Sequence, residues 1–487
     1  MKNVKKIITM AIAVIMCLSV SGCSSPDDTA GSGDITEHLA EDLPVESDGD
    51  APATEEDDYG YDREMTMAPE ETGGVLSPAD SNSGKTIDGG IVDVEDNSDE
   101  TSRNDLNGSE AGRPDYTVEE ISGYFDYAML KEISDREENT VASPLSVKLA
   151  LNMAAMGAKE ETEKELLTLF GYENSEQMRE HSKTLVSELD RADKSITVNN
   201  SVWIDSDFND ISESYTGGLA DVFNAVTFRE KLADQKIVEK LNGWIDEKTN
   251  GLIPNMISEP FQNDTAMLLV NALYFKNEWV HEFTPYYEDF PLTFHGTNGD
   301  SETAGMFLKN DGIKYAENEF FRSVSLDYKD GSYMNIYIPE MTDENILDIV
   351  EKHTPAELAA AMDMDYSEKK VNIDMPRFEC EYSNSLKEIL QRLGMYYTFE
   401  KDLANFDGML IDNSEERIYI SDVIHAAKLE CNEKGTEAAA ATIVAEATAA
   451  ADIIEEPPIN FTVDKPFIYE IKAQSGETLF MGTICGF

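Results

Sequence analysis

Basic residues and histidines are scarce in this sequence. The 487 residues include 38 Lys and Arg against 97 Asp and Glu, so the formal net charge is −59. Nucleic acids and anionic membrane surfaces are therefore disfavoured as partners, because they repel a strongly acidic protein. Despite six histidines, the sequence has no Gly-x-Ser-x-Gly turn, no His-Glu-x-x-His helix and no phosphate-binding glycine loop. We therefore expect a protein that is not an enzyme and that needs no metal and no cofactor.

Cysteine is equally sparse, with five residues in the whole chain. Cys17 and Cys23 lie near the N-terminus, and the remaining three (Cys380, Cys431 and Cys485) lie in apolar runs typical of strands. Their odd number and their spacing form neither a disulfide framework nor a metal-binding motif. We expect the last three to be buried free thiols.

Residues 1–22 begin with lysines and continue with an apolar run from Ile7 to Leu18. The run is too short for a comfortable membrane span and is typical of an export signal. Residues 20–23 (VSGC) resemble the processing box of bacterial lipoproteins. This resemblance implies that Cys23 becomes a lipidated N-terminus, which would hold the protein outside the cytoplasm at the cell surface or allow its later release. An ordinary secretory signal with a chance cysteine is the alternative.

Residues 23–113 are rich in Asp, Glu, Ser, Gly and Thr and contain few large apolar side chains. Such a segment cannot bury enough surface to offset the entropy of ordering. We expect an acidic disordered tether that holds the folded part clear of the envelope. Residues 114–487 are then left with enough apolar sequence for one large domain.

Helix starts and strand runs can be recognised within residues 114–487. Ser143 before Pro144 and Thr354 before Pro355 each predict a helix start, because Ser or Thr caps the first turn and Pro fits the first helical position. β-branched and aromatic runs predict strands at 196–204, 266–275, 334–338, 371–382, 418–431, 461–471 and 478–485. Helices that come mostly early and strands that come mostly late indicate a mixed α+β domain.

Several segments resemble, in the same order, the serpin family of protease inhibitors. They are 139–146 (NTVASPLS), 241–251, 269–276 followed by Trp279, 393–395, 406–408, 420–425, 464–467 and 479–482. The most specific segment is 432–442 (NEKGTEAAAAT), which resembles the hinge of the family's reactive-centre loop. The resemblance covers the predicted domain and implies the serpin fold: helices around a large mixed five-stranded main sheet, two smaller sheets, and an exposed loop at about 433–464.

The resemblance also implies a mechanism. A target serine protease cuts the exposed loop and is held as an acyl-enzyme, and the freed loop then inserts into the main sheet as a new strand. Insertion drags the protease to the opposite pole and distorts its active site. The chain would thus be an irreversible inhibitor that acts as a monomer and forms a covalent complex with its target. A non-inhibitory serpin that acts as a surface binding lipoprotein is the alternative.

The hinge meets a physical requirement for such insertion. A strand that enters a sheet sends alternate side chains into the core, so one parity must be small and uncharged. Thr436, Ala438, Ala440, Thr442 and Val444 have this parity. The remaining hinge residues are Glu433, Gly435, Glu437, Ala439 and Ala441, of which Glu437 can face solvent and Gly435 fits the point where the chain folds back. Glu446 also has the inward parity, so its carboxylate must lie near the open lower end of the sheet or be neutralised.

In inhibitory serpins the distance from the hinge glutamate to the cut bond is nearly fixed. Counted from Glu433, this spacing places the cut between Ala449 and Ala450, with Thr448, Ala450 and Ala451 as alternatives for the residue before the cut. A small residue there suits the shallow pocket of an elastase-like protease, and a subtilisin-like enzyme is also compatible.

Five further residues match positions of the family that control insertion. Ser143, Ser146, Asn271 and His425 match the shutter, and Trp279 matches the breach. The resemblance implies that hydrogen bonds among the shutter residues hold the gap in the sheet closed until the loop is cut.

Overall fold

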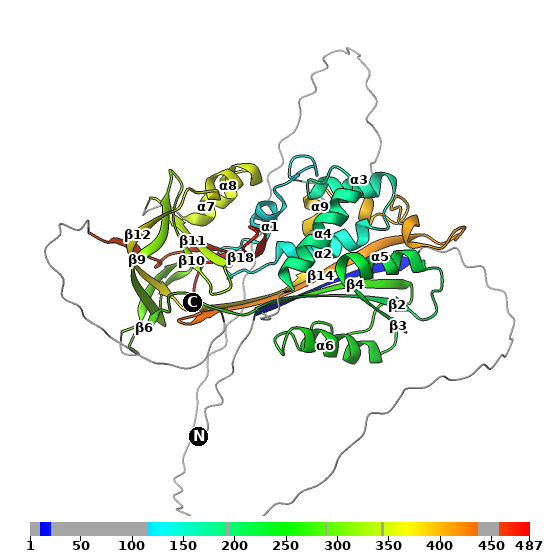
Figure 1. Cartoon of the computed structure of the whole chain (residues 1–487), viewed down its shortest axis with the longest axis horizontal. Helices are drawn as coiled ribbons and strands as arrows, with labels where there is room; N and C mark the ends of the chain where they lie inside the picture. Colours follow the sequence, from blue (N-terminus) through cyan, green and yellow to red (C-terminus); the bar gives the residue numbers. More distant parts are fainter. Residues whose placement is uncertain (1–9, 21–114, 191–194, 288–289, 342–344, 437–456) are drawn as a thin grey trace, which may run out of the picture. The chain divides into compact units, whose positions relative to one another are not determined.

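The computed structural model of this chain describes residues 115–487, except 191–194, 288–289, 342–344 and 437–456, together with the backbone of Met10–Val20 (Figure 1). The predicted tether, the lipidation site Cys23, hinge residues 437–442 and the predicted bond between Ala449 and Ala450 lie outside the described residues.

Two of the helices in the described residues begin where the sequence predicts. Ser143 caps α2 by accepting a hydrogen bond from the backbone N–H of Ser146, and Pro144 is its first residue. Thr354 forms a reciprocal capping box with Glu357 at the start of α8. The helices are α1 (Phe125–Ile133), α2 (Pro144–Ala155), α3 (Glu160–Leu169), α4 (Ser175–Leu189), α5 (Glu213–Phe223), α6 (Lys236–Lys248), α7 (Ile346–Lys352), α8 (Pro355–Met362) and α9 (Lys387–Arg392).

The main sheet has the strand order β3-β2-β4-β1-β14-β15-β5, with β13 paired to β14. Its strands are β1 (Met10–Val20), β2 (Ile196–Asp205), β3 (Val226–Glu230), β4 (Thr265–Phe275), β5 (Asn277–Glu278), β13 (Phe378–Ser385), β14 (Ile418–Asn432) and β15 (Gly435–Thr436). Five of them (β3, β2, β4, β14 and β13) make up the mixed main sheet that the resemblance implies. Strand β1 comes from the predicted export segment and lies between β4 and β14.

Both faces of the main sheet are covered by apolar packing. Figure 1 shows α2 and α5 on one side of the sheet and α6 on the other. On β4, Leu269 and Leu273 belong to the large core that includes α2, whereas Leu268 and Val270 belong to a second cluster with Ile245 of α6. A strand at this place is therefore buried on both faces, which explains why β4 reads as a continuous apolar run.

The second sheet has the order β16-β12-β9-β10-β11-β17-β18, with β6 paired to β9, and a separate hairpin pairs β7 with β8. Its strands are β6 (Thr284–Pro285), β9 (Gly305–Glu317), β10 (Phe321–Asp327), β11 (Tyr333–Pro339), β12 (Ser367–Pro376), β16 (Ile459–Thr462), β17 (Phe467–Lys472) and β18 (Thr478–Ile484); the hairpin is β7 (Leu292–Gly296) and β8 (Gly299–Thr303). The fold class predicted from the sequence is confirmed.

Two predicted strand runs are each divided in the structure. The run 371–382 breaks at Arg377, so β12 joins the second sheet and β13 joins the main sheet. The run 461–471 breaks before Pro466, and its two parts, β16 and β17, lie at different places in the second sheet. In both cases a proline, which lacks an N–H for the ladder, lies beside the break.

Cys380, Cys431 and Cys485 are free and buried, as predicted. Burial raises the pKa of the Cys380 thiol to about 12, so this thiol stays protonated. Within the described residues, no helix is long and apolar enough to cross a membrane.

Candidate functional site

Strand β1 occupies an interval in the middle of the main sheet. It runs antiparallel to β4 on one side and antiparallel to β14 on the other. Strands β4 and β14 are therefore parallel to each other and are separated by the width of one strand, about 10 Å at ~4.8 Å per spacing. We call this interval between β4 and β14 the slot.

The hinge enters the main sheet at the upper end of the same interval. Thr436 lies opposite Cys431 on one side and opposite Asn277 on the other. Gly435 has a φ of +146°, and a Cβ there would lie 2.1 Å from the carbonyl oxygen of Asn277. Only glycine fits this approach, so the glycine predicted for the fold-back point is required where β15 meets β5.

The register of β15 can be continued down the slot. Thr436 lies opposite Asn277 and Cys431. Six residues further along an unbroken antiparallel strand, Thr442 would lie opposite Asn271 of β4 and His425 of β14, because antiparallel partners change by one residue at each step. A strand that continues β15 in this register would therefore pair with both β4 and β14.

Thr436 is held by an aromatic cluster around the predicted breach tryptophan. Its side chain is 1% exposed, and its hydroxyl is 2.7 Å from the hydroxyl of Tyr328. Tyr328 stacks on Trp279 with ring centroids 4.2 Å apart and planes 13° apart. Trp279 in turn donates from its indole N–H to the carbonyl of Asn432, over 2.9 Å. Trp279 thus lies beside the hinge, and Tyr328 links it to Thr436.

Glu433 is tied to the sheet above the slot. Its carboxylate forms an ion pair with Arg377, the residue at which β12 passes into β13. Its carbonyl accepts a hydrogen bond from the backbone N–H of Phe283 (2.7 Å). Both contacts fix the point from which the loop departs. Neither Arg377 nor Tyr328 was singled out in the sequence, because each is a lone residue whose partner is distant in the chain.

The four predicted shutter residues are fully buried. Asn271 and His425 lie on the strands that flank the slot, β4 and β14, and Ser143 and Ser146 lie at the start of α2. The backbone N–H of Ser143 donates to Nε2 of His425 (3.2 Å), and the side-chain amide of Asn271 donates to Oδ1 of Asn200 (2.9 Å). Burial lowers the pKa of His425 to about 3, so its imidazole is neutral. Because Nε2 accepts a hydrogen bond, the ring proton lies on Nδ1.

The structure brings Ser143 to His425 but keeps Asn271 and His425 apart, since β1 runs between their strands. Within the described part of the chain, Nδ1 of His425, Oδ1 of Asn271 and Oγ of Ser146 have no hydrogen-bond partner. Nδ1 of His425 is a donor on β14, and Oδ1 of Asn271 is an acceptor on β4, so the two lie on opposite sides of the slot. Such orphaned buried groups cost free energy as long as a strand separates them.

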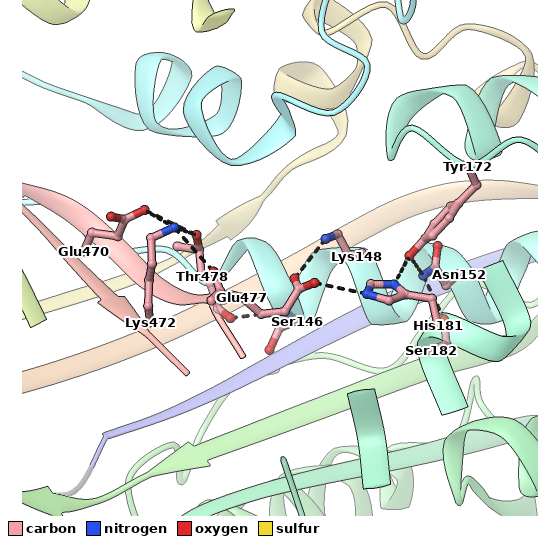
Figure 2. A network of polar contacts seen from close by, with 12 residues as sticks. Ser146, Lys148, Asn152, Tyr172, His181, Ser182, Glu470, Lys472, Glu477 and Thr478 are labelled. Carbon is pink, nitrogen blue, oxygen red and sulfur yellow. Dashed lines mark hydrogen bonds and ion pairs between the residues drawn. The ribbon is translucent and has the colours of Figure 1, made fainter. Parts of the chain in front are cut away.

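A polar network joins α2, the helix that contains the shutter residue Ser146, to its neighbours (Figure 2). Lys148 of α2 pairs with Glu477 (3.1 Å), and Glu477 also contacts His181 of α4 (3.2 Å). Burial alone would raise the pKa of Glu477, but the contacts with His181 and Lys148 outweigh it and lower the pKa to about 2. Nδ1 of His181 lies 2.9 Å from the hydroxyl of Tyr172, which extends the network to that residue. This network could not be recognised in the sequence, because Lys148, His181 and Glu477 are far apart in the chain.

The chemistry available at this site is conformational. Across the described residues, no group of three or more His, Cys, Asp or Glu side chains is placed to hold a metal ion. His425, the histidine at the centre of the main sheet, is fully buried and neutral. The hydrogen bond that its Nε2 accepts from the backbone N–H of Ser143 joins β14 to the start of α2.

Comparison with known proteins gives consistent matches over the folded part. The model of the family described as Serpin (serine protease inhibitor) matches residues 121–486. Neuroserpin of Mus musculus is 30% identical over 398 residues, which cover 76% of this chain and 91% of that protein. Iris of Ixodes ricinus is also 30% identical, covering 72% of this chain and 93% of its own length.

Solved structures agree in fold. The thermophilic serpin tengpin in its native state has a TM-score of 0.63 at 24% identity, covering 76% of this chain and 94% of tengpin. The cleaved serpin 42Da also has a TM-score of 0.63, at 23% identity, covering 76% of this chain and 98% of that structure.

Proposed function

This chain belongs to the serpin family, and we propose that it is an irreversible inhibitor of serine proteases that traps its target by inserting the cut loop into the slot. The observation that carries the proposal is the shared register. Strand β15 already pairs with β14 and β5 at the upper end of the slot. If the strand continued in this register, Thr442 would lie opposite both Asn271 and His425. The small residues predicted at the inward parity suit this buried path.

The covalent step follows from serine-protease chemistry. The protease serine attacks the carbonyl carbon of Ala449, the bond to the nitrogen of Ala450 breaks, and that nitrogen leaves as an amine with a proton from the protease histidine. An ester then joins Ala449 to the protease. Insertion as far as Ala449 would carry this ester on the order of 40 Å along the sheet at ~3.3 Å per residue.

The decisive experiment mixes the processed chain, which lacks residues 1–22, with an elastase and separates the products on a denaturing gel. A covalent band that survives boiling, with the mass of both proteins, is the expected result. Cleavage of the chain with no such band would contradict the proposal and would favour a non-inhibitory serpin that serves as a surface binding lipoprotein. The inward parity of Glu446 is the feature of the loop that favours this second function.

The target class rests on the small residue proposed before the cut. An Ala449→Arg variant should shift inhibition from elastase-like or subtilisin-like proteases toward trypsin-like ones, whose pocket contains a buried acid. Ser475→Arg is the matched control, because Ser475 is exposed in the turn between β17 and β18. Unchanged selectivity of the Ala449 variant would place the cut bond elsewhere.

We also propose that the mature protein is a monomer held by lipid at Cys23, outside the cytoplasm, on an acidic tether formed by residues 23–113. The support is the apolar run followed by VSGC at residues 20–23. Growth with a labelled fatty acid should label the unsubstituted chain and leave a Cys23→Ser variant unlabelled. Equal labelling of the two chains would contradict the anchor.

A further inference from the structure

The slot has an occupant in the structure, and that occupant is a segment of this chain outside the reactive loop. Strand β1 pairs along its length with β4 and with β14. Met10 lies opposite Phe275, and Val14 lies opposite both Asn271 and His425. Continued from β15, the loop would put Ala438 opposite Phe275 and Thr442 opposite Asn271 and His425. Residues 10–20 therefore take the backbone positions that an inserted loop would take.

The two strands cannot occupy the slot together. Strand β15 ends at Thr436, opposite Asn277, and β1 begins at Met10, opposite Phe275. The walls of the slot leave room for one antiparallel strand, so a loop that follows Thr436 meets the end of β1 within about two residues. Insertion beyond that point requires β1 to leave.

The composition of the segment suits this position. Residues 10–20 (MAIAVIMCLSV) contain no charged residue and are apolar or small at both parities. A strand buried on both faces needs apolar residues at both parities, and the walls of the slot are apolar on both faces. The loop residues that would take the same positions, 438–448 (AAAATIVAEAT), are smaller and include Glu446. The N-terminal segment is therefore the better occupant by burial of apolar surface.

We propose that the unprocessed chain is held inactive by its own N-terminal segment: residues 10–20 fill the slot, and loop insertion becomes possible only after this segment has been removed. The proposal rests on the proposed inhibitory mechanism. Removal of residues 1–22 would then activate the inhibitor, in addition to its expected part in export. A chain that retains them is cut by a protease without trapping it.

The test measures occupancy of the slot directly, with a synthetic fluorescent peptide of residues 436–449 as the probe. The peptide is incubated with the full chain, verified by mass to begin at Met1, and binding is read from fluorescence of the protein band on a native gel. Val14→Pro removes an N–H at the centre of β1 and should free the slot, whereas Lys6→Pro lies outside β1 and is the matched control. We expect binding to the Val14 variant at least tenfold above binding to the other two chains. Equal binding to all three chains would overturn the proposal.

A second measurement needs no variant. In the unsubstituted full chain, amide hydrogens of residues 10–20 should exchange as slowly as those of β4, because both belong to one ladder. Exchange of residues 10–20 at the rate of an unstructured peptide would overturn the proposal even if the Val14 variant fails to fold.

Mixing the same three chains with an elastase separates this proposal from the proposed function. A covalent complex formed by the Val14 variant alone supports both. Equal trapping by all three chains contradicts the inactive precursor and leaves the inhibitor intact. Peptide binding confined to the Val14 variant, with no covalent complex from any chain, supports occupancy of the slot and contradicts the inhibitor.

Discussion

Asn271 and His425 lie opposite the same residue, Val14, on the two flanks of β1. His425 presents a protonated Nδ1 and Asn271 presents Oδ1, and neither atom has a partner within the described residues. A donor and an acceptor thus lie on two strands, β14 and β4, that are separated by one strand. If β1 left the slot, β4 and β14 could approach each other, and these two atoms could form a hydrogen bond. The same two residues would then stabilise the closed slot, whereas in the filled slot their unpaired atoms cost free energy.

Loss of the Asn271 side chain should therefore favour the filled state. An Asn271→Ala variant removes the acceptor for His425 in the closed slot, and it also removes an unpaired buried oxygen from the filled slot. Both effects favour the filled slot, by about 1–3 kcal/mol. Once residues 1–22 are absent, we expect spontaneous loss of inhibitory activity at 37 °C to be about tenfold faster. Activity against an elastase, sampled over time, measures this.

Asn335→Ala is the matched control for that change. Asn335 is a buried asparagine of the second sheet and bonds Tyr337 and Glu470. Its loss should lower the melting temperature without accelerating the loss of activity. Equal acceleration in both variants would indicate general destabilisation and would remove the special role of Asn271.

Acid should destabilise the fold through His425. Its pKa is lowered from 6.5 in the unfolded chain to about 3 in the fold by burial, so the unfolded state binds more protons between these values. The contribution of His425 is present above pH 6.5 and is lost as the pH falls toward 3, by about 3 kcal/mol at pH 4.5. Denaturant midpoints of the unsubstituted chain and a His425→Gln variant, measured from pH 7.5 to 4.5, should converge as the pH falls. A constant difference between the two chains would contradict this assignment.

The parts of the fold that could be predicted from sequence are those with local causes. Ser143 and Thr354 each cap a helix with a side chain three residues from its partner, and apolar runs gave β2, β4 and β14 nearly to their ends. Pro376 marks the break before Arg377, but the local sequence does not show that the chain changes sheet there, because β12 and β13 have the same strand period on either side of it.

The site was predictable to the same degree. The hinge and the shutter lie in segments with family-specific sequence, whereas Tyr328 and Arg377 act through partners more than fifty residues away. Strand β1 could not be foreseen, since the core of an export signal and a strand buried on both faces have the same apolar composition. The pairing register of β1 with β4 and β14 is seen only in the structure.

In the chain that lacks residues 1–22, Thr436→Arg should abolish inhibition. The structure has Thr436 already buried against Tyr328, so arginine there must displace the stack of Tyr328 on Trp279 or keep β15 out of the sheet. We expect cleavage without a covalent complex, and also a lower melting temperature of the uncut chain. Glu437→Arg is the control, because Glu437 has the opposite parity and should leave the covalent complex intact. A Thr436 variant that trapped protease at unsubstituted stoichiometry would rule out insertion through the hinge.

Glu446 should limit how efficiently the loop inserts. On the register of β15, Glu446 would lie opposite Met267, which is fully buried, and Ser421. A carboxylate that enters this place loses its hydration or must take up a proton, and either slows the last part of insertion while the protease can still hydrolyse the ester. Glu446→Ala should therefore lower the number of inhibitor molecules consumed per protease trapped.

The matched control is Glu455→Ala, a loop carboxylate that lies beyond the predicted cut and would stay outside the sheet. Titration of an elastase with each variant, in the chain that lacks residues 1–22, gives the stoichiometry. Equal values for the Glu446 variant and the unsubstituted chain would mean that the loop inserts in another register. In that case Thr442 would not lie opposite Asn271 and His425, and the register of β15 would not predict which loop residues enter the slot.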